Sequence, residues 1–245
     1  MSFSVRSLRK ERKMSNIIYG KNSFQEALRN KRIRKAYLLK DSSFIGKLEK
    51  ENIDYEIVSR NRLDGLCRGG NHQGLAAEVL EYKTYKVDEM LRESNGLIVI
   101  LDGLKDPHNL GAIIRTCECA GADGIIYRKH NSVRLNDTVA KVASGALEYV
   151  KVAEVTNLVS TLKHLKEKGY WIVGTDAAAK DLYDRISYDM NTALVIGSEG
   201  EGISRLVKEE CDFMVKMPMY GHINSLNASV AAGIMIYNVL SCRQK

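Results

Sequence analysis

The chain has no run of apolar residues that approaches the roughly 18 needed to cross a membrane, and its first residues, MSFSVRSLRKERKM, lack the apolar segment of a secretory signal. It has no Cys-x-x-Cys pair, and its five cysteines are widely scattered. Neither a disulfide framework nor a structural zinc site is therefore expected. Cys117 and Cys119 lie two apart in a helical pattern, where side chains point in different directions, so buried thiols are the simpler interpretation. These absences favour a cytoplasmic protein that holds no metal.

Positive charge is concentrated at one end of the chain. Residues 1–40 hold 12 Lys and Arg residues and two acids, a net charge of +10, whereas the other 205 residues carry 25 basic and 28 acidic groups, a net charge of −3. Such a patch is typical of proteins with a polyanion partner, because neutralising phosphates releases counterions. For residues 1–13 a solvated tail is an equal alternative. The basic residues from Arg29 to Lys35 lie in a segment that we expect to fold, and they favour contact with RNA.

The length of 245 residues suits a small domain followed by a medium one. We expect a basic disordered tail at 1–15, a small α/β domain at 16–81, a polar linker at 82–96 and a larger α/β domain at 97–245. In the last of these, near-continuous apolar strands alternate with helical patterns, which predicts a buried, mostly parallel sheet. Its strands are expected at 97–101, 124–127, 149–155, 171–175, 193–197 and 213–217, with helices near 109–120, 137–147, 157–168, 203–210 and 227–242.

In open α/β sheets, ligands bind beyond the carboxyl ends of the strands, so the segments that follow the strands are of most interest. In the first of these, a strand ends at Asp102, and a polar loop leads to a helix that carries Arg115. Asn109 suits the N-cap of that helix, and capping alone would explain it. Arg115 lies among apolar residues, where a buried charge needs a partner, and a structural salt bridge is one interpretation.

A second segment, ALVIGSEGEGIS (193–204), places Gly197, Gly200 and Gly202 between a strand and a helix. Glycines let a ligand approach the backbone closely, which suits a nucleotide or nucleoside. The spacing matches neither the dinucleotide fingerprint nor the phosphate-binding loop. Glu199 and Glu201 would repel an anion, so a neutral or cationic ligand fits better. A tight turn with a solvated acid is an equal alternative.

The third segment, 215–240, has a strand that ends at Met217–Pro218 and a loop that leads directly into a helix. The loop carries Ser225, Asn227 and Ser229. Taken alone, these polar residues are best interpreted as helix N-caps.

Taken together, the segments N-L-G-A-I-I-R-T (109–116), I-G-S-E-G-E-G-I (196–203) and M-P-M (217–219) with S-L-N-A-S (225–229) resemble the three motifs of the SpoU/TrmH branch of the SPOUT RNA 2′-O-ribose methyltransferases. Residues 16–80 resemble the family's RNA-binding domain, similar to a ribosomal-protein fold, notably at I-Y-G-K-N-S (18–23) and N-H-Q-G (71–74). Ala228 stands where Val is common, a conservative departure.

This resemblance implies a catalytic domain with a deep trefoil knot, which binds S-adenosylmethionine and forms a homodimer. It implies methyl transfer to a ribose 2′-hydroxyl of RNA without a metal. Cofactor contacts then map to the loops at Gly197, Met217 and Leu226, largely through backbone groups. The catalytic residue maps to Arg115, and the residues expected to orient it and the ribose are Asn109, Glu199, Ser225 and Asn227.

Within the family, the length and two-domain layout resemble the bacterial enzymes that methylate a guanosine of 23S rRNA. An adenosine of 23S rRNA and tRNA are alternative substrates. A non-catalytic RNA-binding protein would have degraded motifs, which is not the case here. A conventional Rossmann-type enzyme would need a glycine-rich turn after the strand at 97–101, where the chain has DGLKDPHNLG instead.

Overall fold

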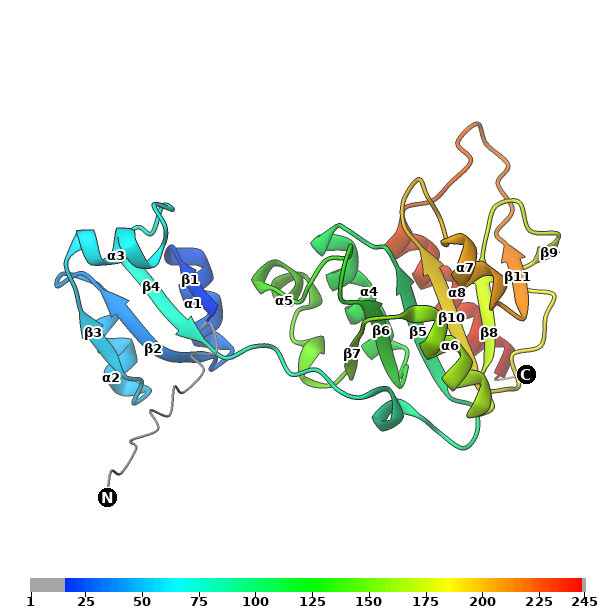
Figure 1. Cartoon of the computed structure of the whole chain (residues 1–245), viewed down its shortest axis with the longest axis horizontal. Helices are drawn as coiled ribbons and strands as arrows, with labels where there is room; N and C mark the ends of the chain where they lie inside the picture. The colour runs from blue at the N-terminus through cyan, green and yellow to red at the C-terminus, as the bar shows by residue number, and fades with distance from the viewer. Residues whose placement is uncertain (1–15, 244–245) are drawn as a thin grey trace, which may run out of the picture. The chain divides into compact units, whose positions relative to one another are not determined.

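The computed structural model describes residues 16–243 (Figure 1), so the predicted tail at 1–15 lies outside the described residues. The chain divides into two compact units between Tyr82 and Lys83. Both are α/β units, as the sequence predicts, and each has its own buried core. Within 16–243, no helix is long and apolar enough to span a membrane.

The first unit contains a four-stranded sheet in the order β1-β4-β2-β3. Strand β4 runs antiparallel to both β1 and β2, whereas β2 and β3 are parallel. Phe24, Leu38 and Leu48 are fully buried in its core. Its elements are β1 (Asn16–Tyr19), α1 (Lys21–Arg29), β2 (Ile33–Leu38), α2 (Ile45–Lys50), β3 (Tyr55–Ile57), α3 (Arg60–Leu66) and β4 (Leu75–Val79).

Two helices of this unit begin in different ways. Helix α1 begins at Lys21 after Gly20, which has a φ of 85°, and no side chain caps it. The cap of α3 is regular, because the Ser59 hydroxyl accepts a hydrogen bond from the backbone N–H of Arg62.

The basic stretch from Arg29 to Lys35 is only partly available to a partner. The Arg32 guanidinium donates to the carbonyl of Leu80 at 2.8 and 3.0 Å and lies 3.5 Å from the centre of the Tyr82 ring. Lys35 forms an ion pair with Glu56 at 2.8 Å. The positive charge that this stretch exposes comes from Arg29, Lys31 and Arg34.

The second unit is built on a seven-stranded sheet in the order β7-β6-β5-β10-β8-β11-β9, in which every pair of neighbours is parallel. The predicted parallel sheet is thereby confirmed. Helices cover both faces (Figure 1). The elements are η1 (Val87–Met90), β5 (Leu97–Asp102), α4 (Pro107–Cys119), β6 (Gly124–Arg128), α5 (Asp137–Ala143), η2 (Ala146–Glu148), β7 (Val152–Val155), α6 (Leu158–Glu167), β8 (Trp171–Thr175), β9 (Asp181–Leu182), β10 (Thr192–Gly197), α7 (Arg205–Glu209), β11 (Phe213–Lys216) and α8 (Ala228–Arg243).

Side chains on the central strands alternate between two cores. On β5, Val99 and Leu101 pack with α4, α5 and α8, whereas Ile98 and Ile100 pack with η1, α6 and α7. Burial on both faces explains why the strands are continuous apolar runs. Because β5 lies between β6 and β10, the carboxyl ends of these strands meet at one edge of the sheet, with Gly197 opposite Asp102. The trefoil knot stays a prediction.

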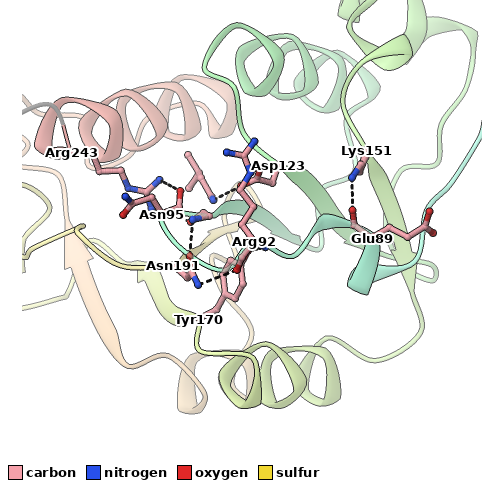
Figure 2. A network of polar contacts seen from close by, with 10 residues as sticks. Glu89, Arg92, Asn95, Asp123, Lys151, Tyr170, Asn191 and Arg243 are labelled. Atoms are coloured by element: carbon pink, nitrogen blue, oxygen red, sulfur yellow. Dashed lines mark hydrogen bonds and ion pairs between the residues drawn. The ribbon is translucent and has the colours of Figure 1, made fainter.

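The polar stretch at 82–96, expected to be a linker, packs against the second unit along most of its length. The backbone N–H of Tyr85 donates to the carbonyl of Val152 at 2.9 Å, and the Met90 side chain is 1% exposed. Figure 2 shows further polar contacts, among them an ion pair between Arg92 and Asp123 and a hydrogen bond from Lys151 to the carbonyl of Glu89.

Arg243, in the last turn of α8, is part of this network at the amino edge of the sheet (Figure 2). Asn191 extends the network, because its side chain accepts from the N–H of Gly96 at 2.7 Å and donates to the carbonyls of Arg92 and Glu93. The contacts hold the entry to β5 against the end of the last helix. The Arg243 guanidinium donates to the carbonyls of Tyr188, Asn95, Gly96 and Met190 and to the hydroxyl of Thr192, at 2.7–3.3 Å.

Candidate functional site

Helix α4 follows the carboxyl end of β5, and its start determines where Asn109 lies. Asp106 is the N-cap, because its carboxylate accepts from the N–H of His108 at 2.9 Å, and Pro107 occupies the first helical position. The prediction that Asn109 caps this helix is therefore wrong. Asn109 lies inside the first turn, is 5% exposed, and directs its side chain to other segments.

Three segments far apart in the sequence meet through one group of side chains, which we call the amide–carboxylate cluster: Asn109, Glu199 and Asn227. The Glu199 Oε1 atom accepts from Asn109 Nδ2 at 2.9 Å and from Asn227 Nδ2 at 2.8 Å. Asn227 Nδ2 also donates to Asn109 Oδ1 at 3.0 Å. Glu199 and Asn227 are exposed, so the buried Asn109 anchors a cluster that faces solvent.

Asn227 has two roles at once. Its Oδ1 accepts from the backbone N–H groups of Ser229 and Val230 at 2.9 and 3.3 Å, and from the Ser229 hydroxyl at 2.6 Å. The capping interpretation is therefore right for Asn227 at the start of α8. Because these donors occupy Oδ1, the amide Nδ2 is turned toward Glu199 and Asn109. Capping fixes the orientation in which Asn227 joins the cluster.

The glycine-rich loop between β10 and α7 places Glu199. Ser198 and Gly202 exchange two backbone hydrogen bonds at 3.0 and 3.1 Å, which close the loop into a tight turn. Gly200 at its tip has a φ of 88°, a region that favours glycine. A Cβ on Gly197 would lie 2.2 Å from the carbonyl carbon of Gly202, so a side chain there would force the loop open. The closed turn therefore fixes the position of Glu199.

A cavity of about 130 Å³ lies beside the cluster and is lined by the ends of β8, β10 and β11 and the loop before α8. Gly197, Met217 and Leu226, the three predicted cofactor residues, all line it. The charged groups in its wall include the acids Asp176 and Glu199 as well as Lys216. A loop closed by backbone bonds, apolar side chains and acids fits a nucleoside with a positive charge better than a phosphate.

Comparison with known proteins identifies the family. Residues 96–237 match the SpoU rRNA Methylase family, and residues 17–85 match the substrate-binding domain of RNA 2′-O ribose methyltransferases. The chain belongs to the SpoU methylase family. It is an S-adenosylmethionine-dependent RNA methyltransferase, so neither a non-catalytic RNA-binding protein nor a Rossmann-type enzyme describes it.

Relatives of this SpoU methylase match over most of its length. YacO of Bacillus subtilis, named as a TrmH family tRNA/rRNA methyltransferase, is 43% identical over 234 residues, which is 91% of this chain and 94% of YacO. A Staphylococcus aureus (strain COL) protein of the same designation is 48% identical over 198 residues, 79% of each chain.

Solved structures show the same fold. The SpoU methyltransferase AviRb of Streptomyces viridochromogenes, in complex with AdoMet, superposes with a TM-score of 0.71 at 22% identity and covers 94% of this chain and 91% of its own. The A. aeolicus TrmH/SpoU tRNA modifying enzyme has a TM-score of 0.57 at 32% identity, over 64% of this chain and 80% of its own.

Two predicted site residues of the SpoU methylase lie outside the amide–carboxylate cluster. Arg115 is exposed on the outer side of α4, and between residues 16 and 243 it has no ion-pair partner, so the expected salt bridge is not found there. Ser225 lines the cavity and is exposed. Of the five predicted catalytic residues, the structure thus brings three into direct contact and leaves Arg115 and Ser225 open to a partner.

Residues that sequence analysis missed also line the cavity. Asp176 directly follows β8, and its pKa is lowered, first by a hydrogen bond from Lys208 and then by one from the N–H of Ala178. Its position after a strand was the signal that could have found it, because ligands gather at the carboxyl ends of parallel strands. Asp176 adds a carboxylate that stays ionised in the wall of the cavity.

The five cysteines differ in burial. Cys117 is completely buried, and burial raises its pKa, whereas Cys119 is exposed. The part of the chain from 16 to 243 has no group of three His, Cys, Asp or Glu side chains that could hold a metal.

Proposed function

We propose that this SpoU methylase transfers the methyl group of S-adenosylmethionine to the ribose 2′-hydroxyl of a guanosine in 23S rRNA. The observation that supports it most is the meeting of Asn109, Glu199 and Asn227 beside a cavity without a phosphate-binding loop. The match of residues 17–85 to the substrate-binding domain of RNA 2′-O ribose methyltransferases supports the site of methylation. The two-unit layout supports rRNA as the substrate.

In this proposal, the loops at Gly197, Met217 and Leu226 hold the cofactor, which supplies the methyl group as a sulfonium. The carboxylates of Glu199 and Asp176 favour a positive charge in the cavity that they line. Transfer to a hydroxyl requires that the acceptor is held in line and that its proton is removed. The amide–carboxylate cluster and Ser225 provide groups that position the ribose.

Arg115 is the residue that we assign to the reacting hydroxyl. A guanidinium is effectively always protonated in proteins, and its charge stabilises a developing alkoxide. Its exposure, without an ion-pair partner in the described chain, leaves the side chain free to contact RNA. We assign the proton to a phosphate of the RNA, because no carboxylate or imidazole between residues 16 and 243 is paired with Arg115 and the Glu199 carboxylate is bonded to Asn109 and Asn227.

We further propose that the enzyme is a homodimer in which a second copy covers α8. This helix has apolar residues on all sides, although such helices are normally buried. Val230, Ile234 and Tyr237 lie on one face and are 49%, 38% and 49% exposed. Thr116 of α4, the neighbour of Arg115 in sequence, lies next to Gly233 of α8. A second copy that covers this face of α8 would therefore also reach Arg115.

Sedimentation or light scattering tests the dimer. Ile234→Glu should give a monomer, because it places a charge in the apolar face. Glu167→Gln, at an exposed acid of α6 on the opposite face of the sheet, should leave the assembly unchanged. A wild-type protein that is monomeric at micromolar concentration would contradict the dimer but not the chemistry.

The substrate is tested by incubating the protein with labelled S-adenosylmethionine and either unmodified 23S rRNA or unmodified tRNA. Primer extension at low nucleotide concentration then maps each 2′-O-methyl group. We expect a single stop at a guanosine of 23S rRNA. Label in tRNA alone, or at an adenosine, would overturn the substrate and leave the reaction class intact.

A further inference from the structure

A second cavity, of about 530 Å³, opens at the carboxyl edge of the same sheet. It shares Ser198 and Gly202 with the candidate cofactor cavity, so the glycine-rich loop separates the two. Its size falls within the roughly 300–1,000 Å³ that is usual for small-ligand sites. None of the residues to which a role in cofactor binding or methyl transfer is assigned above lines this cavity.

One side chain that lines the second cavity, Arg128, is held in place by a buried carboxylate. Asp102, at the end of β5, is 3% exposed, and its two oxygens accept from Arg128 Nη2 at 2.9 Å and from the N–H of Ser204 at 2.8 Å. The carboxylate is thus fully engaged and neutralised by Arg128. The Arg128 side chain is 30% exposed and makes only this one hydrogen bond within 16–243, so its other N–H groups remain available to a ligand in the cavity.

The remaining charged groups define what the cavity can bind. Lys105 and Glu201 line it from two different loops, so two cationic donors, Lys105 and Arg128, are present together with a carboxylate acceptor. Guanine presents acceptors at O6 and N7, which Arg and Lys recognise, and N1–H and N2–H donors, which suit a carboxylate. Adenine turns an amino donor toward the cations and has no N1–H donor. A free phosphate would meet the repulsion of Glu201.

We propose that this cavity receives the base of the target nucleotide, turned out of the RNA, and selects guanine. The inference rests on the proposed function and adds a specificity site to it. Enzymes that act on one nucleotide commonly extrude it from its stack into a fitted pocket. A base held here has its ribose next to the 198–202 loop, which also carries Glu199 to the amide–carboxylate cluster. The exposed Lys129, His130 and Arg134 beside the cavity's 131–133 wall suit contacts to RNA phosphates.

The first test measures binding of guanosine 5′-monophosphate and adenosine 5′-monophosphate to the full chain by NMR titration with S-adenosylmethionine present. We expect the guanosine nucleotide to bind about tenfold more tightly, the preference that one good bidentate contact provides. Glu201→Gln and Arg128→Lys should each remove most of this preference. Arg128→Lys keeps a positive charge beside Asp102, so the buried carboxylate stays paired. The variant loses the two parallel N–H donors with which a guanidinium binds two acceptors at once.

Glu93→Gln, an exposed acid before β5, serves as the matched control and should bind both nucleotides like the wild type. Equal binding of the two nucleotides, binding of neither, or a preference that survives Glu201→Gln would overturn the proposal.

The second test separates this inference from the proposed function. RNA with the target guanosine replaced by adenosine or inosine is offered to the wild type and to Glu201→Gln, and kcat/KM for methyl transfer is compared. We expect the wild type to reject adenosine, and the variant to lose most of that discrimination. A wild type that methylates RNA while the variant discriminates equally well would refute the base pocket alone. A wild type that methylates no RNA would refute the proposed function, while the nucleotide titration would still decide on the pocket.

Discussion

The two edges of the seven-stranded sheet use polar side chains in opposite ways. At the amino edge, Arg243 and Asn191 are bound to backbone carbonyls and N–H groups of neighbouring segments. At the carboxyl edge, Glu199 and Asn227 bond to each other yet remain exposed. Arg115, in the third turn of the helix that starts at this edge, has no ion-pair partner in the described chain. Satisfied polar groups stabilise a fold, whereas exposed groups held in place are available to a ligand.

The amino edge of the sheet thus serves stability, and the carboxyl edge serves ligand binding. The amino edge joins the segment before β5 to the end of α8, so it contributes to the free energy of unfolding. The carboxyl edge collects the family motifs and both cavities. Substitutions should therefore separate into those that impair stability and those that impair methyl transfer.

The largest expected effect is that of Arg115→Ala. We expect kcat to fall by a factor on the order of 10²–10⁴, the contribution of a positioned catalytic group. Because Arg115 is exposed, the free energy of unfolding should change by no more than about 0.5 kcal/mol. Methyl transfer to RNA and urea unfolding are measured on the same preparation. Arg185→Ala, another exposed arginine, is the control, and equal turnover in the two variants would reject the assignment.

Arg243→Ala should have the next largest effect, at the other edge. It removes all five hydrogen bonds that the guanidinium donates, and a loss of about 2–4 kcal/mol is expected. Trp171, the only tryptophan, lies in β8 and reports unfolding of the second unit by fluorescence. Arg243→Lys should recover part of the loss. A variant as stable as the wild type would show that the network does not hold this edge.

Glu199→Gln sharpens the comparison within the carboxyl edge. The side chain keeps its shape, but its hydrogen bonds to Asn109 and Asn227 lose the charge that strengthens them. We expect about a tenfold fall in kcat/KM with little change in the urea midpoint. A clearly lowered urea midpoint with an unchanged kcat/KM would show that Glu199 stabilises the fold and does not contribute to methyl transfer.

The smallest effect concerns Asp176 and its pH dependence. A pKa below the ordinary value of 3.8 means that Asp176 stabilises the fold above that pH and loses this contribution as the pH falls through its folded value. Lys208→Met removes the hydrogen bond that lowers the pKa most. It should cost less than about 1 kcal/mol at pH 7, and the difference from the wild type should vanish at strongly acidic pH. A difference that persists there would have another cause.

Much of the fold follows from local patterns. The apolar runs at 97–101 and 193–197 predict buried strands, and both are present as β5 and β10. Their pairing could not be predicted, since it joins segments about a hundred residues apart and depends on tertiary packing. The two-residue strand β9 is too short for a hydrophobic period.

The site was predicted as a set of residues but not as an arrangement. Asn109 looks like an N-cap, but Asp106 is the N-cap and Pro107 begins the helix, three residues earlier than an Asn109 cap would place them. Arg115 looks buried among apolar neighbours, although Glu118 and Cys119, one turn later, are also exposed and mark an outward stripe. Arg243 carries no sequence signal, because its partners are backbone carbonyls that any residue provides.

Arg115→Ala and Arg243→Ala, compared in two measurements, separate the residues that carry the chemistry from those that stabilise the fold. Methyl transfer to RNA is determined per folded molecule, and the urea midpoint is determined from Trp171 fluorescence. We expect opposite results for the two variants. Arg115→Ala should be inactive with a wild-type midpoint, and Arg243→Ala should have a lowered midpoint but wild-type turnover when folded. If Arg115→Ala turns over like the wild type, or if each variant lowers both quantities equally, the assignment of chemistry to the carboxyl edge and stability to the amino edge is contradicted.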